Sequence, residues 1–170
     1  MKIVTIFAEK LFSFHYEGEV DNEFDRLMEL WTNPQYLKKF AEDNEIADVE
    51  DYVLDRLSDA EQIQDVLDEI ETDEVPLEQY FKPLFDKETG IKILSLRKGK
   101  LNHNHLRIYA IKIDTDCFVI TGGAIKMSQA MQDFPDTQIE LDKLYAAQRY
   151  LKDNGVFDID SFFELLREAK

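Results

Sequence analysis

Three consecutive segments between residues 91 and 121 have the composition of β-strands, and they constrain the fold more than any other feature of the sequence. Residues 91–97, 106–113 and 117–121 are rich in aliphatic and β-branched side chains, and Gly, Asn or Asp residues lie around their ends. Three residues, 114–116, separate the second segment from the third, which suits a tight hairpin. The sequence therefore predicts an antiparallel meander of three strands.

Strands and helices are also predicted before this meander. Two strands are expected over residues 2–7 and 11–16, followed by helices over residues 22–31 and 34–44, in which apolar residues recur at steps of three and four. Pro34 separates the two helices because proline is favoured in the first turn of a helix.

A third and longer helix, over residues 48–71, combines an apolar face with a strongly acidic opposite face. Residues 48–74 contain 12 Asp and Glu residues but a single basic residue, Arg56. A surface of this charge can dock against a basic one.

The end of the chain carries two patterns that are typical of helix N-termini. Thr137 and Ser161 are each followed three residues later by Glu, which is the spacing of a capping box. We therefore expect a helix over residues 138–153 and a short C-terminal helix over about residues 161–169.

These elements together indicate a single α+β domain, residues 1–170, in which helices pack on an antiparallel sheet. Its core is expected to comprise residues 1–44 and 89–153. We interpret residues 46–88 as an acidic helical insertion into that core.

The charge of the chain excludes general adhesion to nucleic acid or to anionic membranes. The 20 Lys and Arg residues against 36 Asp and Glu residues give a formal net charge of −16, so the summed field repels phosphate groups at long range. Residues 91–126 differ, because seven basic residues there stand against two acidic ones. Any anion site should therefore be local to residues 91–126, which we call the basic segment.

The cysteine content and the hydropathy predict a location in the cytoplasm. Cys117 is the only cysteine, which excludes an intrachain disulfide and fits a reducing compartment. The first residues lack the apolar region of a signal peptide, and no stretch reaches the roughly 18 apolar residues of a membrane span. We expect no binding to membranes, and the oligomeric state stays open.

Five side chains of the basic segment are candidates for binding a phosphodiester. Guanidinium and ammonium groups that converge on one phosphate can stabilise the charge that develops during in-line displacement. The alternative is that these side chains only keep the edge of a sheet soluble. The five candidates are Arg97, Lys98, Lys100, Arg107 and Lys126.

Two histidines and two glycines extend this set of candidates. His103 and His105 would lie on one side of an extended segment and could transfer protons, or they could be solvated loop residues. No cysteine or carboxylate motif completes a ligand set with them, so we expect no metal and no cofactor. Gly122 and Gly123 could let the backbone approach a phosphate, or they could mark a β-bulge.

Two stretches of the basic segment resemble the RelE/HigB/ParE toxin superfamily, especially its HigB-like, phage-derived host-killing branch. Residues 106–113 read LRIYAIKI, and residues 117–126 read CFVITGGAIK. In that branch a strand that opens with Leu-Arg or Tyr-Arg leads through a tight hairpin to an aliphatic strand, which ends in a glycine-bearing turn and a lysine. The resemblance covers about residues 91–152.

This resemblance implies a small α+β fold and a toxin of a type II toxin-antitoxin system that cleaves mRNA on the ribosome. By position, Arg107 and Lys126 correspond to basic residues that stabilise phosphate charge in the family. Arg97 and Lys98 lie where the preceding strand offers further cations. The implied partners are an antitoxin protein, the ribosome and mRNA.

Two other functions stay open from the sequence. The ParE branch of the superfamily implies inhibition of DNA gyrase. Alternatively, the chain is a non-catalytic, toxin-like protein whose acidic helix binds a basic partner or covers its own basic segment.

Overall fold

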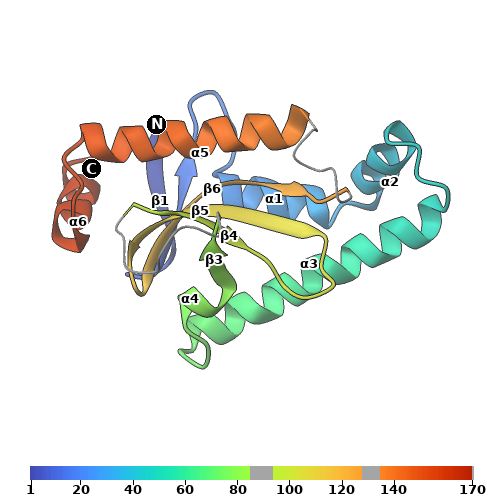
Figure 1. Cartoon of the computed structure of the whole chain (residues 1–170), viewed down its shortest axis with the longest axis horizontal. Coiled ribbons are helices and arrows are strands. Elements are labelled where there is room, and N and C mark those ends of the chain that lie inside the picture. Colours follow the sequence, from blue (N-terminus) through green and yellow to red (C-terminus); the bar gives the residue numbers. More distant parts are fainter. Residues whose placement is uncertain (85–93, 128–134, 170) are drawn as a thin grey trace.

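The structure is a computed structural model that describes residues 1–84, 94–127 and 135–169. Within these residues the strands form one sheet in the order β1-β2-β6-β5-β4-β3 (Figure 1). The strands are β1 (Lys2–Phe7), β2 (Leu11–His15), β3 (Phe81–Pro83), β4 (Leu96–Gly99), β5 (Leu106–Asp114) and β6 (Cys117–Ile125).

Helices flank this sheet, so the predicted α+β class is confirmed. Among the described residues, no helix is both long enough and apolar enough to cross a membrane. The helices are α1 (Glu23–Trp31), α2 (Pro34–Asp43), α3 (Val49–Glu71), α4 (Leu77–Tyr80), α5 (Pro135–Asp153) and α6 (Ile159–Glu168).

Strands β4, β5 and β6 form the predicted antiparallel meander, with bounds that differ from those expected. β4 starts at Leu96 rather than at residue 91, and residues 91–93 lie outside the described part of the chain. β6 continues to Ile125, so the two glycines lie inside this strand rather than after it. The register shifts between the pair Tyr109 and Gly122 and the pair Ala110 and Ile120, so Thr121 rather than a glycine is the extra residue of β6.

The expectation of a fully antiparallel sheet is wrong, because β2 runs parallel to β6. The partners in this pair are Leu11 with Phe118, and Ser13 with Ile120. After β2 the chain passes through α1, α2, α3 and α4 and returns to the sheet at β3, and β6 follows only after β4 and β5. This long connection allows β2 and β6 to lie parallel. The sheet is therefore mixed.

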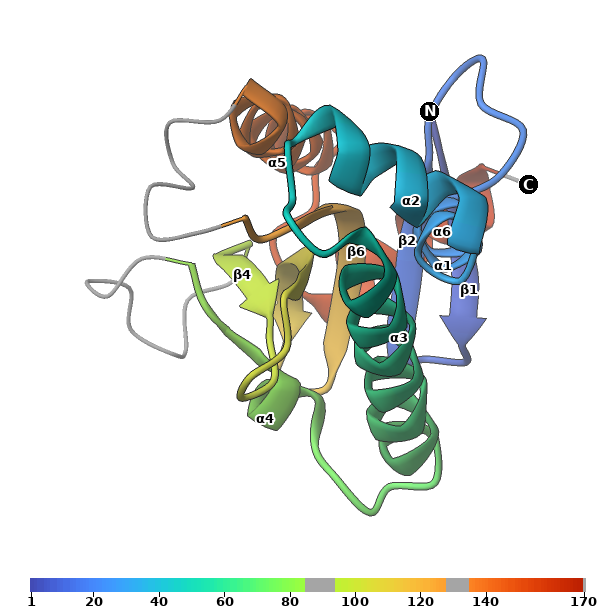
Figure 2. The ribbon, with the colours of Figure 1, turned by 90° about the vertical axis from the view of Figure 1, so that its right-hand side faces the viewer.

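Both faces of the sheet are buried under helices. Figures 1 and 2 show α5 along one face and α3 along the other. Alternate residues of β5 point to opposite faces of the sheet. Ile108 and Ala110 pack in the core on the α3 side, and Tyr109 and Ile111 pack in the core on the α5 side. The sheet thus has two cores, which we call the α3-side core and the α5-side core.

Helix α3 has the amphipathic character that the sequence predicts. Ile63, Leu67 and Ile70 are buried in the α3-side core, whereas the acidic residues of the opposite face are exposed. Arg56, the single basic residue of this helix, is buried, so its charge faces the protein rather than solvent. The charged residues on the exposed face of α3 are consequently all acidic.

The two predicted capping boxes at the end of the chain are not the ones that the structure contains. α5 begins at Pro135, before Thr137, whose side chain lies outside the described residues. α6 begins at Ile159, because Asp158 rather than Ser161 is its N-cap. The Asp158 carboxylate accepts from the Ser161 N–H at 2.8 Å, and the Ser161 hydroxyl accepts from the Asp158 N–H at 3.0 Å.

Candidate functional site

The cations of the basic segment do not all gather in one place, because they lie on both faces of the sheet. Arg97 pairs with Ala110 and therefore points to the α3 side. Arg107 is three residues from Ala110 on the same strand and so lies on the α5-side face. Lys98, the partner of Tyr109, shares that face, whereas Lys100 is exposed beyond the end of β4.

Arg97 and Lys112 are buried, and each contacts a polar side chain. The Arg97 guanidinium is buried and donates to the Ser95 hydroxyl at 3.1 Å. Lys112, which is also buried, forms an ion pair with Glu78 of α4. These contacts make Arg97 and Lys112 part of the sheet's packing on the α3 side.

Three of the predicted residues do come together, where β5 begins and β6 ends. The backbone N–H of Lys126 donates to the backbone carbonyl of His105 at 2.6 Å. The Arg107 guanidinium donates to the carbonyls of Asn104, at 2.6 Å, and Leu106, at 3.0 Å. The charges of Arg107 and Lys126 both act on the His105 imidazole. His105, Arg107 and Lys126 therefore form one electrostatic unit.

Helix α3 completes this unit with two residues that the sequence analysis did not select. Arg56 donates from Nη2 to His105 Nδ1 at 3.1 Å and from Nε to Asp59 Oδ2 at 2.8 Å. The same Asp59 oxygen accepts from the backbone N–H of His105 at 3.1 Å. We call Arg56, Asp59, His105, Arg107 and Lys126 the histidine cluster.

The loop before β5 is anchored to α3 by Asn104, next to the exposed His105. Asn104 is buried and donates to the Asp59 carbonyl at 2.9 Å, while its own side-chain oxygen accepts from the Leu106 N–H at 2.9 Å. His103 is exposed, with a φ of 62°, and has no contact with the cluster among the described residues. The two histidines therefore differ, and only His105 belongs to a built site.

The environment of His105 keeps its imidazole neutral near neutral pH. Desolvation lowers its pKa, the Arg56 charge lowers it further, and Arg107 and Lys126 add to this, whereas Asp59 partly opposes them. An arginine can only donate, so Nδ1 accepts and the neutral ring carries its proton on Nε2. Because 46% of the His105 side chain is exposed, this N–H is available as a donor to a ligand.

Acidification should destabilise the protein through His105. Its folded-state pKa lies below the ordinary value of 6.5, so as the pH falls through that value the unfolded chain takes up the proton first. The unfolding free energy should therefore decrease until the folded-state pKa is reached. Urea unfolding between about pH 7 and about pH 5.5 should show a weaker pH dependence for His105→Gln than for wild type. His103→Gln should behave like wild type, and equal slopes in all three proteins would contradict this prediction.

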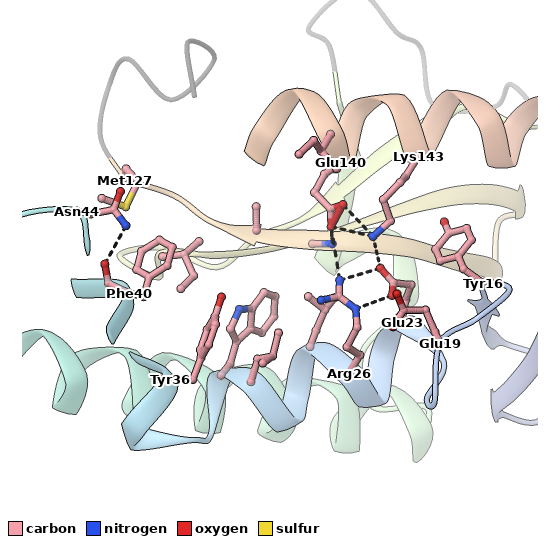
Figure 3. A pocket seen from close by; sticks show the side chains of 17 residues that line it. Tyr16, Glu19, Glu23, Arg26, Tyr36, Phe40, Asn44, Met127, Glu140 and Lys143 are labelled. Carbon is pink, nitrogen blue, oxygen red and sulfur yellow. Dashed lines mark hydrogen bonds and ion pairs between the residues drawn. The ribbon is translucent and has the colours of Figure 1, made fainter. Parts of the chain in front are cut away.

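A cleft of about 560 Å³ lies between α1, α2, β6 and the first turns of α5 (Figure 3). One end is aromatic and is lined by Trp31, Tyr36 and Phe40. The other end is charged. Gly123 and Ile125 of β6 also line the cleft. Its size is in the range of sites for small molecules.

Four side chains form an ionic network at the charged end, with Glu23 and Arg26 from α1 and Glu140 and Lys143 from α5 (Figure 3). Arg26 donates to both oxygens of Glu23, at 2.6 and 2.9 Å, and Lys143 pairs with Glu23 and, at 2.9 Å, with Glu140. Burial raises the pKa of Glu23, but hydrogen bonds from Arg26 and Lys143 outweigh it and hold that pKa below its usual value. Glu23 is therefore bound as a carboxylate.

Gly122 and Gly123 make room for this network. A Cβ on Gly122 would lie 2.7 Å from Glu140 Oε1, and the Gly123 N–H donates to the same oxygen at 3.0 Å. The backbone of the glycine pair thus contacts an anion, as its composition suggested, but this anion is the protein's own carboxylate.

No group of three or more His, Cys, Asp or Glu side chains within the described ranges could hold a metal ion.

Comparison of the chain with models of protein families, with curated proteins and with solved structures finds no match.

Proposed function

We propose that the chain is a RelE/HigB-like toxin that cleaves mRNA on the ribosome, and that the histidine cluster holds the scissile phosphate. The observation that carries the proposal is the state of His105. Its exposed imidazole has a lowered pKa, accepts a hydrogen bond from Arg56 and lies within reach of the charges of Arg107 and Lys126. Donors fixed in this way stabilise negative charge without reorganisation.

The chemistry that this cluster supports is an in-line attack within RNA. The 2′-oxygen forms a bond to phosphorus while the bond from phosphorus to the 5′-oxygen breaks, which gives a 2′,3′-cyclic phosphate and a 5′-hydroxyl. The 2′-hydroxyl proton passes to water, and the leaving 5′-oxygen takes a proton from water. His105 Nε2–H and the Lys126 ammonium are assigned to the phosphate oxygens, where charge accumulates.

The buried arginines are assigned positioning roles. Arg56 fixes the imidazole ring through Nδ1, and Arg107 holds the carbonyls on both sides of His105. Of the residues suggested by the resemblance, the proposal keeps Arg107 and Lys126. It leaves out Arg97, because that guanidinium is buried within the packing of the sheet and donates to the Ser95 hydroxyl.

Cleavage of mRNA by purified protein tests this proposal. Translating ribosomes that carry a defined mRNA should yield fragments with 2′,3′-cyclic phosphate ends after the protein is added. Naked mRNA should be cut far less. Intact mRNA in both reactions would reject the assignment as a ribonuclease, and equal cutting in both would reject ribosome dependence. An antitoxin protein is the expected partner that suppresses the activity.

The exposed face of α3 favours a second candidate, a non-catalytic protein that binds a basic partner. The only cation of this helix, Arg56, is buried, so the exposed face carries negative charge alone. Such a face attracts basic surfaces and gives binding that weakens with salt. Its exposed acids are Glu50, Asp51, Asp55, Glu61, Asp65, Asp68, Glu69 and Glu71.

Neutralising part of this face separates the two candidates. Changing Asp65, Asp68 and Glu69 to the corresponding amides leaves the buried apolar residues of α3 in place. If the chain is a ribonuclease that uses the histidine cluster, this variant should cut RNA like wild type. If this variant loses the effect that the wild-type chain has in cells although its histidine cluster is unchanged, the non-catalytic binding protein would be favoured.

A further inference from the structure

The cleft and the histidine cluster are joined by a continuous row of side chains. Phe40 lines the cleft and stacks on Tyr52, with ring centroids 6.3 Å apart and planes 15° apart. The Arg56 guanidinium lies over the Tyr52 ring, 4.7 Å from its centroid, and also contacts His105. A chain of contacts therefore leads from the cleft wall to the imidazole.

Strand β6 makes a second connection between the two places. Ile125 lines the cleft, and the N–H of the next residue, Lys126, is bonded to the His105 carbonyl. The same strand therefore runs from the cleft to the histidine cluster.

The cleft offers an aromatic wall next to accessible cationic donors. Tyr36 and Phe40 are only partly buried, and aromatic rings of this kind bind nucleobases by stacking. Glu23 is buried, with 1% of its side chain exposed, whereas the side chains of Arg26 and Lys143 are 30% and 25% exposed. The acids thus hold the cations in place, and the cations face the cleft.

Arg26 has donor capacity left for a ligand. Its Nε and one Nη2 bond go to Glu23, and within the described ranges its Nη1 donates no hydrogen bond. Figure 3 shows its guanidinium between the aromatic end of the cleft and the carboxylates. A planar group stacked on the aromatic wall would meet this donor at its edge.

We propose that the cleft binds a guanine base of the RNA strand, an inference that rests on the proposed ribonuclease function. Guanine presents two neighbouring acceptors, O6 and N7, which a guanidinium such as that of Arg26 can bind. Adenine has an amino group in place of O6, so that group would face a cation instead of accepting from it. The cleft should therefore select guanine over adenine.

Trp31 provides the measurement, because it is the only tryptophan of the chain and lines the cleft. Guanosine 5′-monophosphate should change its fluorescence saturably and should bind about tenfold tighter than adenosine 5′-monophosphate. Inorganic phosphate should have no effect at the same concentrations. No saturable change with the guanosine nucleotide, or equal effects of all three compounds, would overturn the proposal.

Variants locate the binding to the cleft. Tyr36→Leu and Phe40→Leu keep apolar bulk but remove the stacking rings, so each should weaken binding about tenfold. Phe157→Leu is the matched control, because Phe157 is 72% exposed and lies outside the cleft, and it should bind like wild type. Thermal melting checks that each variant is folded. Unchanged binding in folded Tyr36→Leu and Phe40→Leu would overturn the assignment to the cleft.

The outcome for the cleft is distinguishable from that for the proposed function. Saturable guanine binding without RNA cleavage by wild type would support the cleft and reject the ribonuclease. RNA cleavage without guanine binding would support the ribonuclease and reject the cleft.

Discussion

Replacing Glu23 with alanine is expected to lower the free energy of unfolding by about 3 kcal/mol, because it removes the buried carboxylate that two half-buried cations share. Arg26 bonds to both oxygens of Glu23, and Lys143 pairs with Glu23 from α5. Without this carboxylate, Glu140 alone must neutralise both cations. The expected loss is at the low end for a buried pair, because Arg26 and Lys143 are both partly exposed.

Urea unfolding of Glu23→Ala and of a surface control measures this effect. Lys39 and Asp43 of α2 also form an ion pair, at 3.0 Å, but their side chains are 76% and 61% exposed. Asp43→Ala should therefore change the free energy of unfolding by less than about 0.5 kcal/mol. Equal losses in the two variants would show that the network joining α1 to α5 adds no more than a surface ion pair.

Joint replacement of His105 and Lys126 by alanine is expected to reduce the rate of RNA cleavage by a factor of about 10² to 10³. These two side chains are the ones assigned to the phosphate oxygens, so their loss removes the donors to the developing charge. Arg107 is a poorer choice for this test, because it is buried and bonds to two backbone carbonyls.

The chain contains matched controls for this double variant. His103 and Lys100 are a histidine and a lysine of the same basic segment, and both are exposed. His103 has no contact with the histidine cluster among the described residues. His103→Ala with Lys100→Ala should therefore cleave RNA at the wild-type rate. A loss as large as that of the His105 and Lys126 variant would mean that net charge, rather than the cluster, is responsible.

Sequence patterns predicted much of the fold because hairpins and helices depend on interactions between residues that are close in the sequence. The hairpin between β5 and β6 follows from a short polar link between two apolar runs, and α3 follows from apolar residues at helical spacing. The parallel pairing of β2 with β6 joins residues about 107 apart in the chain, such as Leu11 and Phe118, and no local pattern encodes it. The N-cap of α6 was missed because Asp158, rather than Ser161, accepts the capping bond.

The candidate site was predictable only in part. Alternation assigns faces within one strand, but the relative faces of Arg97 and Arg107 depend on the register between β4 and β5. The contact of Arg56 with His105 spans 49 positions in the sequence, so spacing could not reveal it. The one available signal was that Arg56 is the single basic residue of an acidic helix and stands three residues before Asp59.

Mapping of mRNA ends in growing cells tests the central claim most directly, namely that the histidine cluster cleaves RNA. After induction of the wild-type chain, primer extension on an abundant mRNA should reveal new 5′ ends within the translated region. Induction of the His105→Ala and Lys126→Ala double variant to the same level should leave that mRNA intact. Identical new ends with both proteins, or no new ends with either, would contradict the claim.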